Sequence, residues 1–197
     1  MDSRKRLGEA KFFLDQLKNH ESDSEKFEYY MTAFLTSWRS VMDVMLYDVA
    51  EHFLGLSRDD QYNEEEIRAI AEKKGCKEVI NFVSWWSGKQ KILLKSPLWN
   101  KRNVSFHRGY PSMNIEFIYL GNSGGTSGTI SVNLRAYTPD LSDEYPIRGP
   151  VPQPDFASKR FSFSDIPGRS AISVCEEAYD QIERFVDEAE KVLNLKL

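Results

Sequence analysis

The chain has 197 residues, of which 41% are hydrophobic and 28% charged, and its formal net charge is −4. This composition is typical of a globular protein with a buried core; it excludes a disordered chain and a broadly basic nucleic-acid-binding protein. No apolar run approaches the roughly eighteen residues that a membrane span requires, and no signal-peptide pattern follows the first residues. We therefore expect one cytoplasmic domain with no membrane partner.

The cysteines and histidines give no sign of a metal centre or a disulfide. Cys76 and Cys175 lie far apart without Cys-x-x-Cys spacing, which favours reduced, partly buried thiols. The three histidines show no paired spacing with cysteines or carboxylates. We expect no metal and no cofactor.

The N-terminal part reads as two helices, over residues 4–19 and 24–54, in which apolar side chains recur at three- and four-residue spacing. Ser24 is the expected N-cap of the second helix. That helix carries a second apolar stripe, so it should be buried on two sides, either centrally in a bundle or against a second subunit. The stripe is formed by Leu35, Met42 and Leu46.

Three further helices are expected before residue 111. The first spans Glu64 to Lys74, and the second runs from Cys76 to Trp86 and ends at Ser87-Gly88. Residues 97–110 form the third, because Pro97 suits a first helical turn and Gly109 followed by Pro111 ends it.

From Tyr110 the apolar period changes from helical to alternating, which predicts a β-hairpin over about 115–137. The glycine-rich loop inside it lacks the Gly-Lys-Ser/Thr ending of a phosphate-binding loop. Residues 138–158 hold five of the eight prolines and should form an extended surface loop, while Lys159 to Ser164 is typical of a third, edge strand.

A closing amphipathic helix is expected over 170–194. Ser173 and Glu176 resemble a capping box, and a start one turn earlier near Ser170 is the alternative.

The helix expected at 97–110 carries the residues best suited to chemistry. Asn103 and His107 are four residues apart and share a face, and Arg102 lies about 140° round from His107, within reach of its long side chain. An imidazole, a guanidinium and an amide can thus converge on one small anion. The alternative is that His107 caps a helix or satisfies a core polar group. His20 lies in a polar break and His52 near a helix end, and neither has a comparable arginine and asparagine near it in the sequence.

Six basic residues and no acidic one lie between Gly88 and Arg108, so the rest of the chain sums to about −10. Charge runs alone favour a solvated face. Their coincidence with His107 favours contact with substrate phosphates by Lys89, Lys91, Lys95, Lys101 and Arg108.

The segment Arg102-Asn103-Val104-Ser105-Phe106-His107 resembles the Arg-Asn-x-x-x-His motif of HEPN domains (higher eukaryotes and prokaryotes nucleotide-binding). These are all-α modules with two long N-terminal helices, an aromatic-rich connection, the motif helix and a closing helix. Many of them are metal-independent ribonucleases. The resemblance covers residues 1–110 and 165–197 in architecture. It departs at Gly109, where members paired with nucleotidyltransferases often carry tyrosine.

The predicted fold class is therefore mainly α, an antiparallel HEPN-like bundle with a small β insertion at about 111–164 whose role the sequence does not assign. The predicted function is endoribonuclease activity of a homodimer on RNA, as in a toxin or defence system, with no antitoxin or nucleotidyltransferase partner identified. Catalysis would fall to Arg102, Asn103 and His107. The alternative is a non-catalytic HEPN-like dimeric module for nucleotide or RNA binding, or for interaction only.

Overall fold

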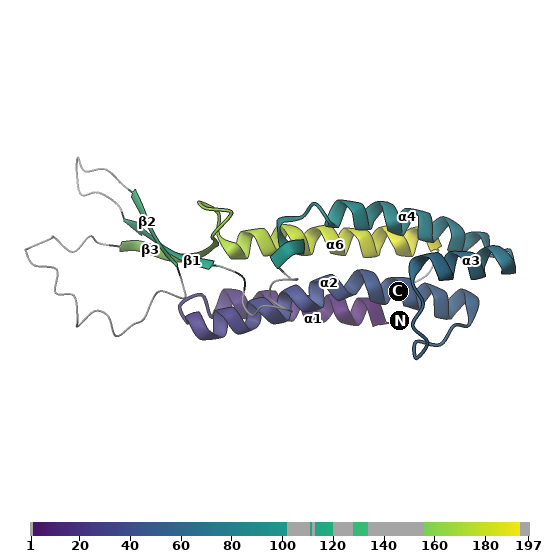
Figure 1. Ribbon diagram of the computed structural model, residues 1–197. Helices are drawn as coiled ribbons and strands as arrows, with labels where there is room; N and C mark the ends of the chain where they lie inside the picture. The colour runs from purple at the N-terminus through teal and green to yellow at the C-terminus, as the bar shows by residue number, and fades with distance from the viewer. Residues whose placement is uncertain (1, 102–110, 112, 120–127, 134–155, 194–197) are drawn as a thin grey trace, which may run out of the picture.

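The computed structural model describes residues 2–101, 111, 113–119, 128–133 and 156–193. Long helices form its main body, with a short helix at one end and a small sheet at the other (Figure 1). This arrangement confirms a mainly α protein with a small antiparallel β part. The elements are α1 (Asp2–Asn19), α2 (Ser24–Leu54), α3 (Glu64–Lys74), α4 (Lys77–Leu93), β1 (Met113–Tyr119), β2 (Gly128–Asn133), β3 (Phe156–Phe163) and α6 (Ala171–Leu193).

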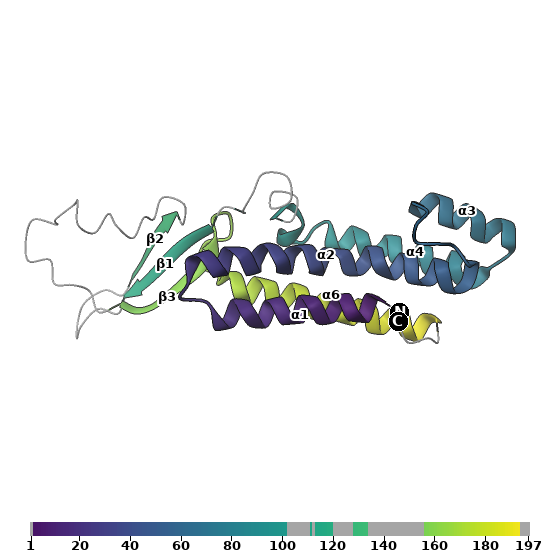
Figure 2. The same cartoon turned by 90° about the horizontal axis from the view of Figure 1, so that it is seen from below.

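Helices α1, α2, α4 and α6 pack as a four-helix bundle in that cyclic order, and neighbouring helices run in opposite directions (Figures 1 and 2). Helix α3 packs against α2 and α4 at the end away from the sheet. One continuous hydrophobic core runs through the bundle and extends to β1 and β3. The helices and the sheet therefore share one core.

Helix α2 is buried on two sides within this single chain. Leu35 and Met42 are fully buried, and Leu46 is 5% exposed, because α2 packs against α1 on one flank and α4 on the other. The second apolar stripe is thus explained by intramolecular packing, as in the central alternative. It gives no reason to invoke a second subunit, and the predicted homodimer now has only the family resemblance behind it.

Two tryptophans link the helices through polar contacts inside the core. Trp38 of α2 donates its Nε1–H to the Ala178 carbonyl of α6 at 2.9 Å. Trp86 of α4 donates its Nε1–H to the Met42 carbonyl of α2, also at 2.9 Å. A buried indole N–H without a partner would be unfavourable, so these contacts allow large aromatic side chains to fill the bundle.

The caps of two helices differ from prediction, although the predicted bounds of α2 and α3 are confirmed. Asp23, not Ser24, caps α2, because its carboxylate accepts the Lys26 N–H at 3.1 Å. Helix α6 begins at Ala171, so the capping box at Ser173 is wrong and the alternative start near Ser170 is correct. Helix α3 has the predicted bounds, with a capping box between Asn63 and Glu66.

Substituting the cap of α2 distinguishes the two candidate residues. We expect Asp23→Ala to lower the urea midpoint of unfolding, because the N–H of Lys26 loses its acceptor and the helix dipole loses a negative charge. Ser24→Ala should leave the midpoint nearly unchanged. Unfolding followed by circular dichroism measures both; a larger loss for Ser24→Ala would restore serine as the cap.

We predicted that helix α4 ends at Ser87-Gly88. In the structure it continues to Leu93. The Ser87 hydroxyl donates to the Val83 carbonyl at 2.9 Å, so the serine is satisfied inside the helix. A helical glycine is disfavoured by only about 1 kcal/mol relative to alanine. The burial of Trp86 before Gly88 and of Leu93 after it outweighs this cost and keeps the segment helical.

The sheet has the order β2-β1-β3 and is antiparallel throughout. It confirms the hairpin and the third edge strand, which begins earlier than predicted, so the last residues expected in the surface loop belong to β3. One face packs on the bundle, where the Phe161 ring stacks on Phe27 at 4.2 Å. Residues 120–127 and 134–155, with the glycine-rich loop and most of the proline-rich stretch, lie outside the described residues.

Candidate functional site

A helix begins at Pro97, as predicted, and its described part is 97–101. Ser96 Oγ accepts the Leu98 N–H at 3.3 Å, and Leu98 is fully buried. The Arg39 guanidinium of α2 lies over the Trp99 ring, 4.0 Å from its centre. These contacts fix the start of the helix against the bundle.

The three motif residues, Arg102, Asn103 and His107, lie outside the described part of the chain, as does Arg108, a predicted phosphate contact. Their convergence on one anion therefore stays a prediction, and the described site consists of what precedes and surrounds them.

Lys101, the residue before the motif, is held inside the protein. Its Nζ pairs with Asp165 and lies 5.3 Å from the centre of the Phe163 ring. The residue is only 9% exposed. We predicted that Lys101 contacts substrate. In the structure its charge is in an ion pair with Asp165, which joins the helix to the turn after the β segment, and contact with substrate stays a prediction.

Asp165 belongs to a turn, residues 164–169, that folds over the sheet and leads into α6. Gly168 has a φ of 80° and donates its N–H to Glu116 Oε1 at 3.1 Å. Arg160, opposite Glu116 in the register, donates its Nε–H to Oε2 at 2.7 Å. A buried carboxylate thus anchors the turn that holds Lys101.

Burial alone would raise the pKa of Glu116, but the neighbouring Ser162 hydroxyl, the Gly168 N–H and Arg160 favour the charged form, so its pKa lies below the usual 4.5. A carboxylate whose pKa is lower in the folded than in the unfolded protein stabilises the fold when the pH is above its unfolded-state pKa. This stabilisation is lost as the pH falls through its folded-state pKa.

We therefore expect Glu116→Gln to destabilise the protein at pH 7 and to do so less as the pH falls below about 4.5. Thermal unfolding of both proteins between pH 7 and pH 3 measures the difference. Glu183→Gln, on α6, serves as the control carboxylate. A Glu116→Gln defect that is independent of pH would show that the carboxylate's charge is not what stabilises the turn.

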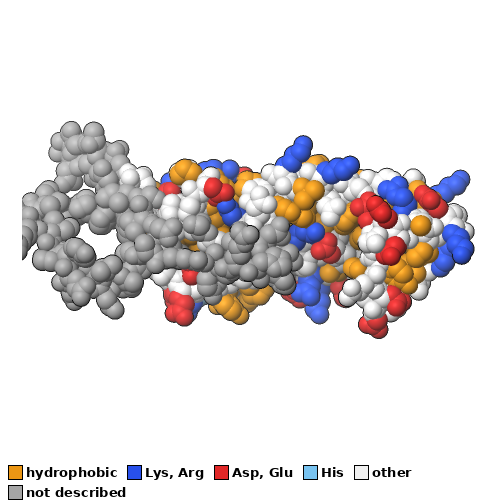
Figure 3. Space-filling model, viewed as in Figure 1, with side chains coloured by type: hydrophobic (Ala, Val, Ile, Leu, Met, Phe, Trp, Pro, Cys, Tyr) orange, Lys and Arg blue, Asp and Glu red, His pale blue; other side chains and the backbone are white. Residues whose placement is uncertain are grey.

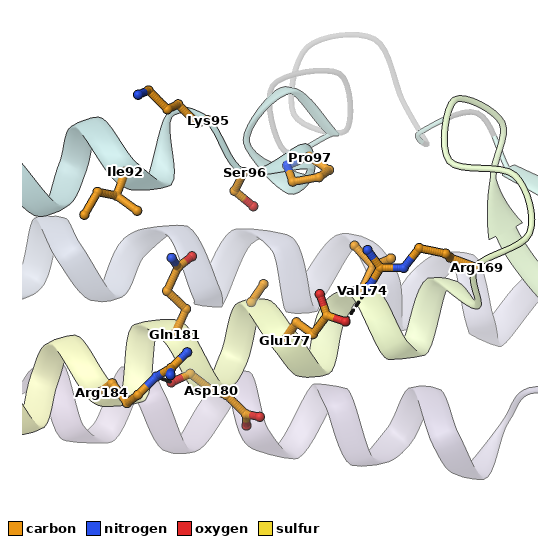
Figure 4. A pocket seen from close by; sticks show the side chains of 11 residues that line it. Ile92, Lys95, Ser96, Pro97, Arg169, Val174, Glu177, Asp180, Gln181 and Arg184 are labelled. Carbon is orange, nitrogen blue, oxygen red and sulfur yellow. Dashed lines mark hydrogen bonds and ion pairs between the residues drawn. The ribbon is translucent and has the colours of Figure 1, made fainter.

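A hollow of about 460 Å³ lies between the Ile92-to-Pro97 segment and α6, next to the start of the motif helix (Figure 4). Its lining combines cationic, acidic, uncharged polar and apolar side chains. They are Ile92, Lys95, Ser96, Pro97, Arg169, Val174, Glu177, Ala178, Asp180, Gln181 and Arg184. Arg169 pairs with Glu177 at 2.5 Å, and Arg184 donates its Nε–H to the Asp180 carbonyl at 3.1 Å.

The other predicted phosphate-binding lysines divide into two groups. Lys89 pairs with Glu188 at 2.5 Å and lies near the rings of Trp85 and Phe185. Lys91 and Lys95 are exposed, and no acidic group in the described ranges pairs with either. Figure 3 shows basic, acidic and hydrophobic side chains mixed along the upper edge of the bundle, where α4 lies.

Arg169 and Arg184 were not among the predicted site residues. Both are more than 60 positions after the motif in sequence, and they line the hollow beside Pro97 only because α6 packs against α4. The one signal in the sequence was that they lie at the start and on the polar face of the closing helix.

A second hollow, of about 430 Å³, lies where α1 begins and α2 ends and is lined by Asp2, Asp48, Glu51, His52 and Arg58. The buried Asp48 carboxylate accepts the Ser3 N–H at 2.8 Å and also pairs with Arg58. Arg58 also pairs with Asp2 and Glu51. The cluster ties α1 to α2, and its carboxylates are all engaged.

The remaining histidine, His20, has Nδ1 2.9 Å from the Gln16 carbonyl and packs near Tyr30. The His20 ring thus contacts a backbone carbonyl in the last turn of α1. Across the described ranges, no group of three or more histidine, cysteine, aspartate or glutamate side chains is arranged to hold a metal ion. Within the same ranges, no helix has the length and apolar character needed to cross a membrane.

The described site is thus the start of a helix, a buried lysine just before the motif, and a hollow lined by three basic and two acidic side chains. No known family model matches the chain, and neither a curated protein nor a solved structure matches it.

Proposed function

We propose that this protein is a HEPN-type, metal-independent endoribonuclease. The observation that carries the proposal is the Arg102-Asn103-x-x-x-His107 spacing, which follows a helix start at Pro97 in an antiparallel helical bundle. The order of helices before and after the motif also agrees with that of the family.

In the proposed reaction the ribose 2′-oxygen attacks the adjacent phosphorus, and the bond to the 5′-oxygen breaks. One group removes the 2′-hydroxyl proton, and another protonates the leaving 5′-oxygen. The products are a 2′,3′-cyclic phosphate and a 5′-hydroxyl. His107 is suited to proton transfer, because an unperturbed imidazole has a pKa near 6.5. Arg102 stabilises the charge that develops on the phosphorane, and Asn103 orients the imidazole or binds a non-bridging oxygen.

One histidine cannot easily serve both sides of the phosphorus at once. A two-fold dimer that brings two motifs together would supply the base and the acid. The family resemblance supports such a dimer, and a cytoplasmic toxin or defence system is the setting that the resemblance suggests.

The second candidate function is a non-catalytic module that binds nucleotide or RNA, or only a protein partner. It is favoured by the net charge of −4 and by the intramolecular ion pairs of Lys89 and Lys101, which reduce the positive charge available to RNA. The Arg102, Asn103 and His107 set favours the enzyme.

Incubation of purified protein with end-labelled single-stranded RNA in EDTA tests the proposal. Cleavage should continue without divalent metal and yield a cyclic phosphate end, and salt should weaken it because phosphate contacts are screened. Loss of activity in EDTA, with recovery on Mg²⁺ addition, would contradict the mechanism. RNA that binds but is never cut would favour the second candidate.

A further inference from the structure

We propose that the hollow between the Ile92-to-Pro97 segment and α6 is a binding subsite for a backbone phosphate of single-stranded RNA, away from the bond that is cut. The inference rests on the proposed function in taking RNA as the ligand. The subsite adds Arg184 and Arg169 to the residues that were predicted from the sequence to contact substrate.

The first support is cationic charge that the described residues leave available. Arg184 uses its Nε–H on the Asp180 carbonyl, and no carboxylate in the described ranges pairs with its two terminal amino groups. Lys95, on the opposite wall, is also exposed and has no described acidic partner. A guanidinium with free forked donors is well suited to a phosphate.

The second support is that the acidic residues of the lining are turned away or engaged. In Figure 4 the Asp180 side chain points away from Lys95 and Ser96. Glu177 pairs with Arg169 at the rim.

The third support is the shape and remaining chemistry of the hollow. About 460 Å³ is within the range of small-molecule sites and suits a nucleotide-sized unit. Ser96 and Gln181 offer hydrogen-bonding groups, and Ile92, Val174 and Ala178 offer apolar contact. A ribose or base next to the bound phosphate can use both.

The fourth support is the position along the chain. Pro97 lines the hollow, and Arg102 follows five residues later, so their Cα atoms are at most about 18 Å apart whatever the backbone conformation. A strand of a few nucleotides can therefore occupy the hollow and the motif together.

Binding can be measured separately from cleavage with a fluorescein-labelled, fully 2′-O-methylated RNA 12-mer, which lacks the attacking hydroxyl. Measured by fluorescence anisotropy, Arg184→Gln and Lys95→Gln should each raise Kd about 3–10-fold. Each should also reduce the slope of log Kd against log salt concentration by about the amount that one phosphate contact contributes. Glu177→Gln should lower Kd, because Arg169 loses its competing carboxylate. Arg6→Gln, an exposed arginine of α1 paired with Glu9, is the matched control and should change nothing.

Equal Kd values for Arg184→Gln and Arg6→Gln would overturn the subsite. So would an Arg184→Gln effect seen with AMP but not with the 12-mer, since the ligand would then be a mononucleotide. Cleavage of unmodified RNA is assayed in parallel. If binding depends on Arg184 but RNA is not cleaved, the subsite is supported and the proposed enzymatic activity is contradicted. If RNA is cleaved but Arg184→Gln binds it as tightly as the wild type, the activity is supported and the subsite is contradicted.

Discussion

Replacement of His107 by alanine is expected to lower the rate of RNA cleavage by about 10²–10⁴, the usual contribution of a positioned proton-transfer group. The alanine variant cannot take or give a proton. Arg102→Ala should lower the rate by about 10²–10³ through loss of charge stabilisation, and Asn103→Ala should lower it less. Single-turnover cleavage of labelled RNA in EDTA gives each rate.

His20→Ala is the matched control, because His20 lies at the end of α1 in the α1–α2 connection and contacts Gln16 and Tyr30. It should cleave like the wild type, with the fold of every variant checked by circular dichroism. If His107→Ala and the wild type cleave equally, the activity comes from a contaminant. The non-catalytic module would then be the better account of the chain.

The largest expected loss of stability follows Trp38→Ala, which should lower the free energy of unfolding by about 3–5 kcal/mol. Trp38 is fully buried and donates to the Ala178 carbonyl across the α2–α6 packing. Truncation therefore leaves a large cavity and removes a hydrogen bond that crosses the helix packing. Urea unfolding followed by fluorescence of the remaining tryptophans measures the loss.

Phe12→Ala is the control for this change, because the Phe12 side chain is 55% exposed on α1. A surface substitution of this kind should change the free energy of unfolding by no more than about 0.5 kcal/mol. Similar losses for the two variants would mean that Trp38 is not part of a well-packed core.

The helices could be predicted because their apolar periods are long. Over α2 the repeat persists for the whole helix, and no competing pattern exists at that length. Local ends were harder to predict, because they depend on single hydrogen bonds. The Asp23 cap and the Ser87 hydroxyl bond within α4 are each one contact, and neighbouring residues of similar chemistry offered equally good alternatives.

The apolar stripes of α2 could not identify what covers them. Periodicity reports that a face is buried, and Met42 and Leu46 would look the same against another helix or another subunit. In the structure the cover is intramolecular. The basic run had the same ambiguity: Lys89 and Lys101 find Glu188 and Asp165, partners that are far away in sequence and that no local pattern reveals.

The tie between Lys101 and Asp165 has a consequence for how the protein can be shortened. A chain in which residues 111–164 were replaced by a short linker would keep the bundle helices. It would lose Phe163, which lies under Lys101, and Glu116, which holds the Gly168 turn. A cation buried just before Arg102 would then lack part of its support. The β segment is therefore not a dispensable attachment, and a minimal helical version would be a different molecule at the position where the motif begins.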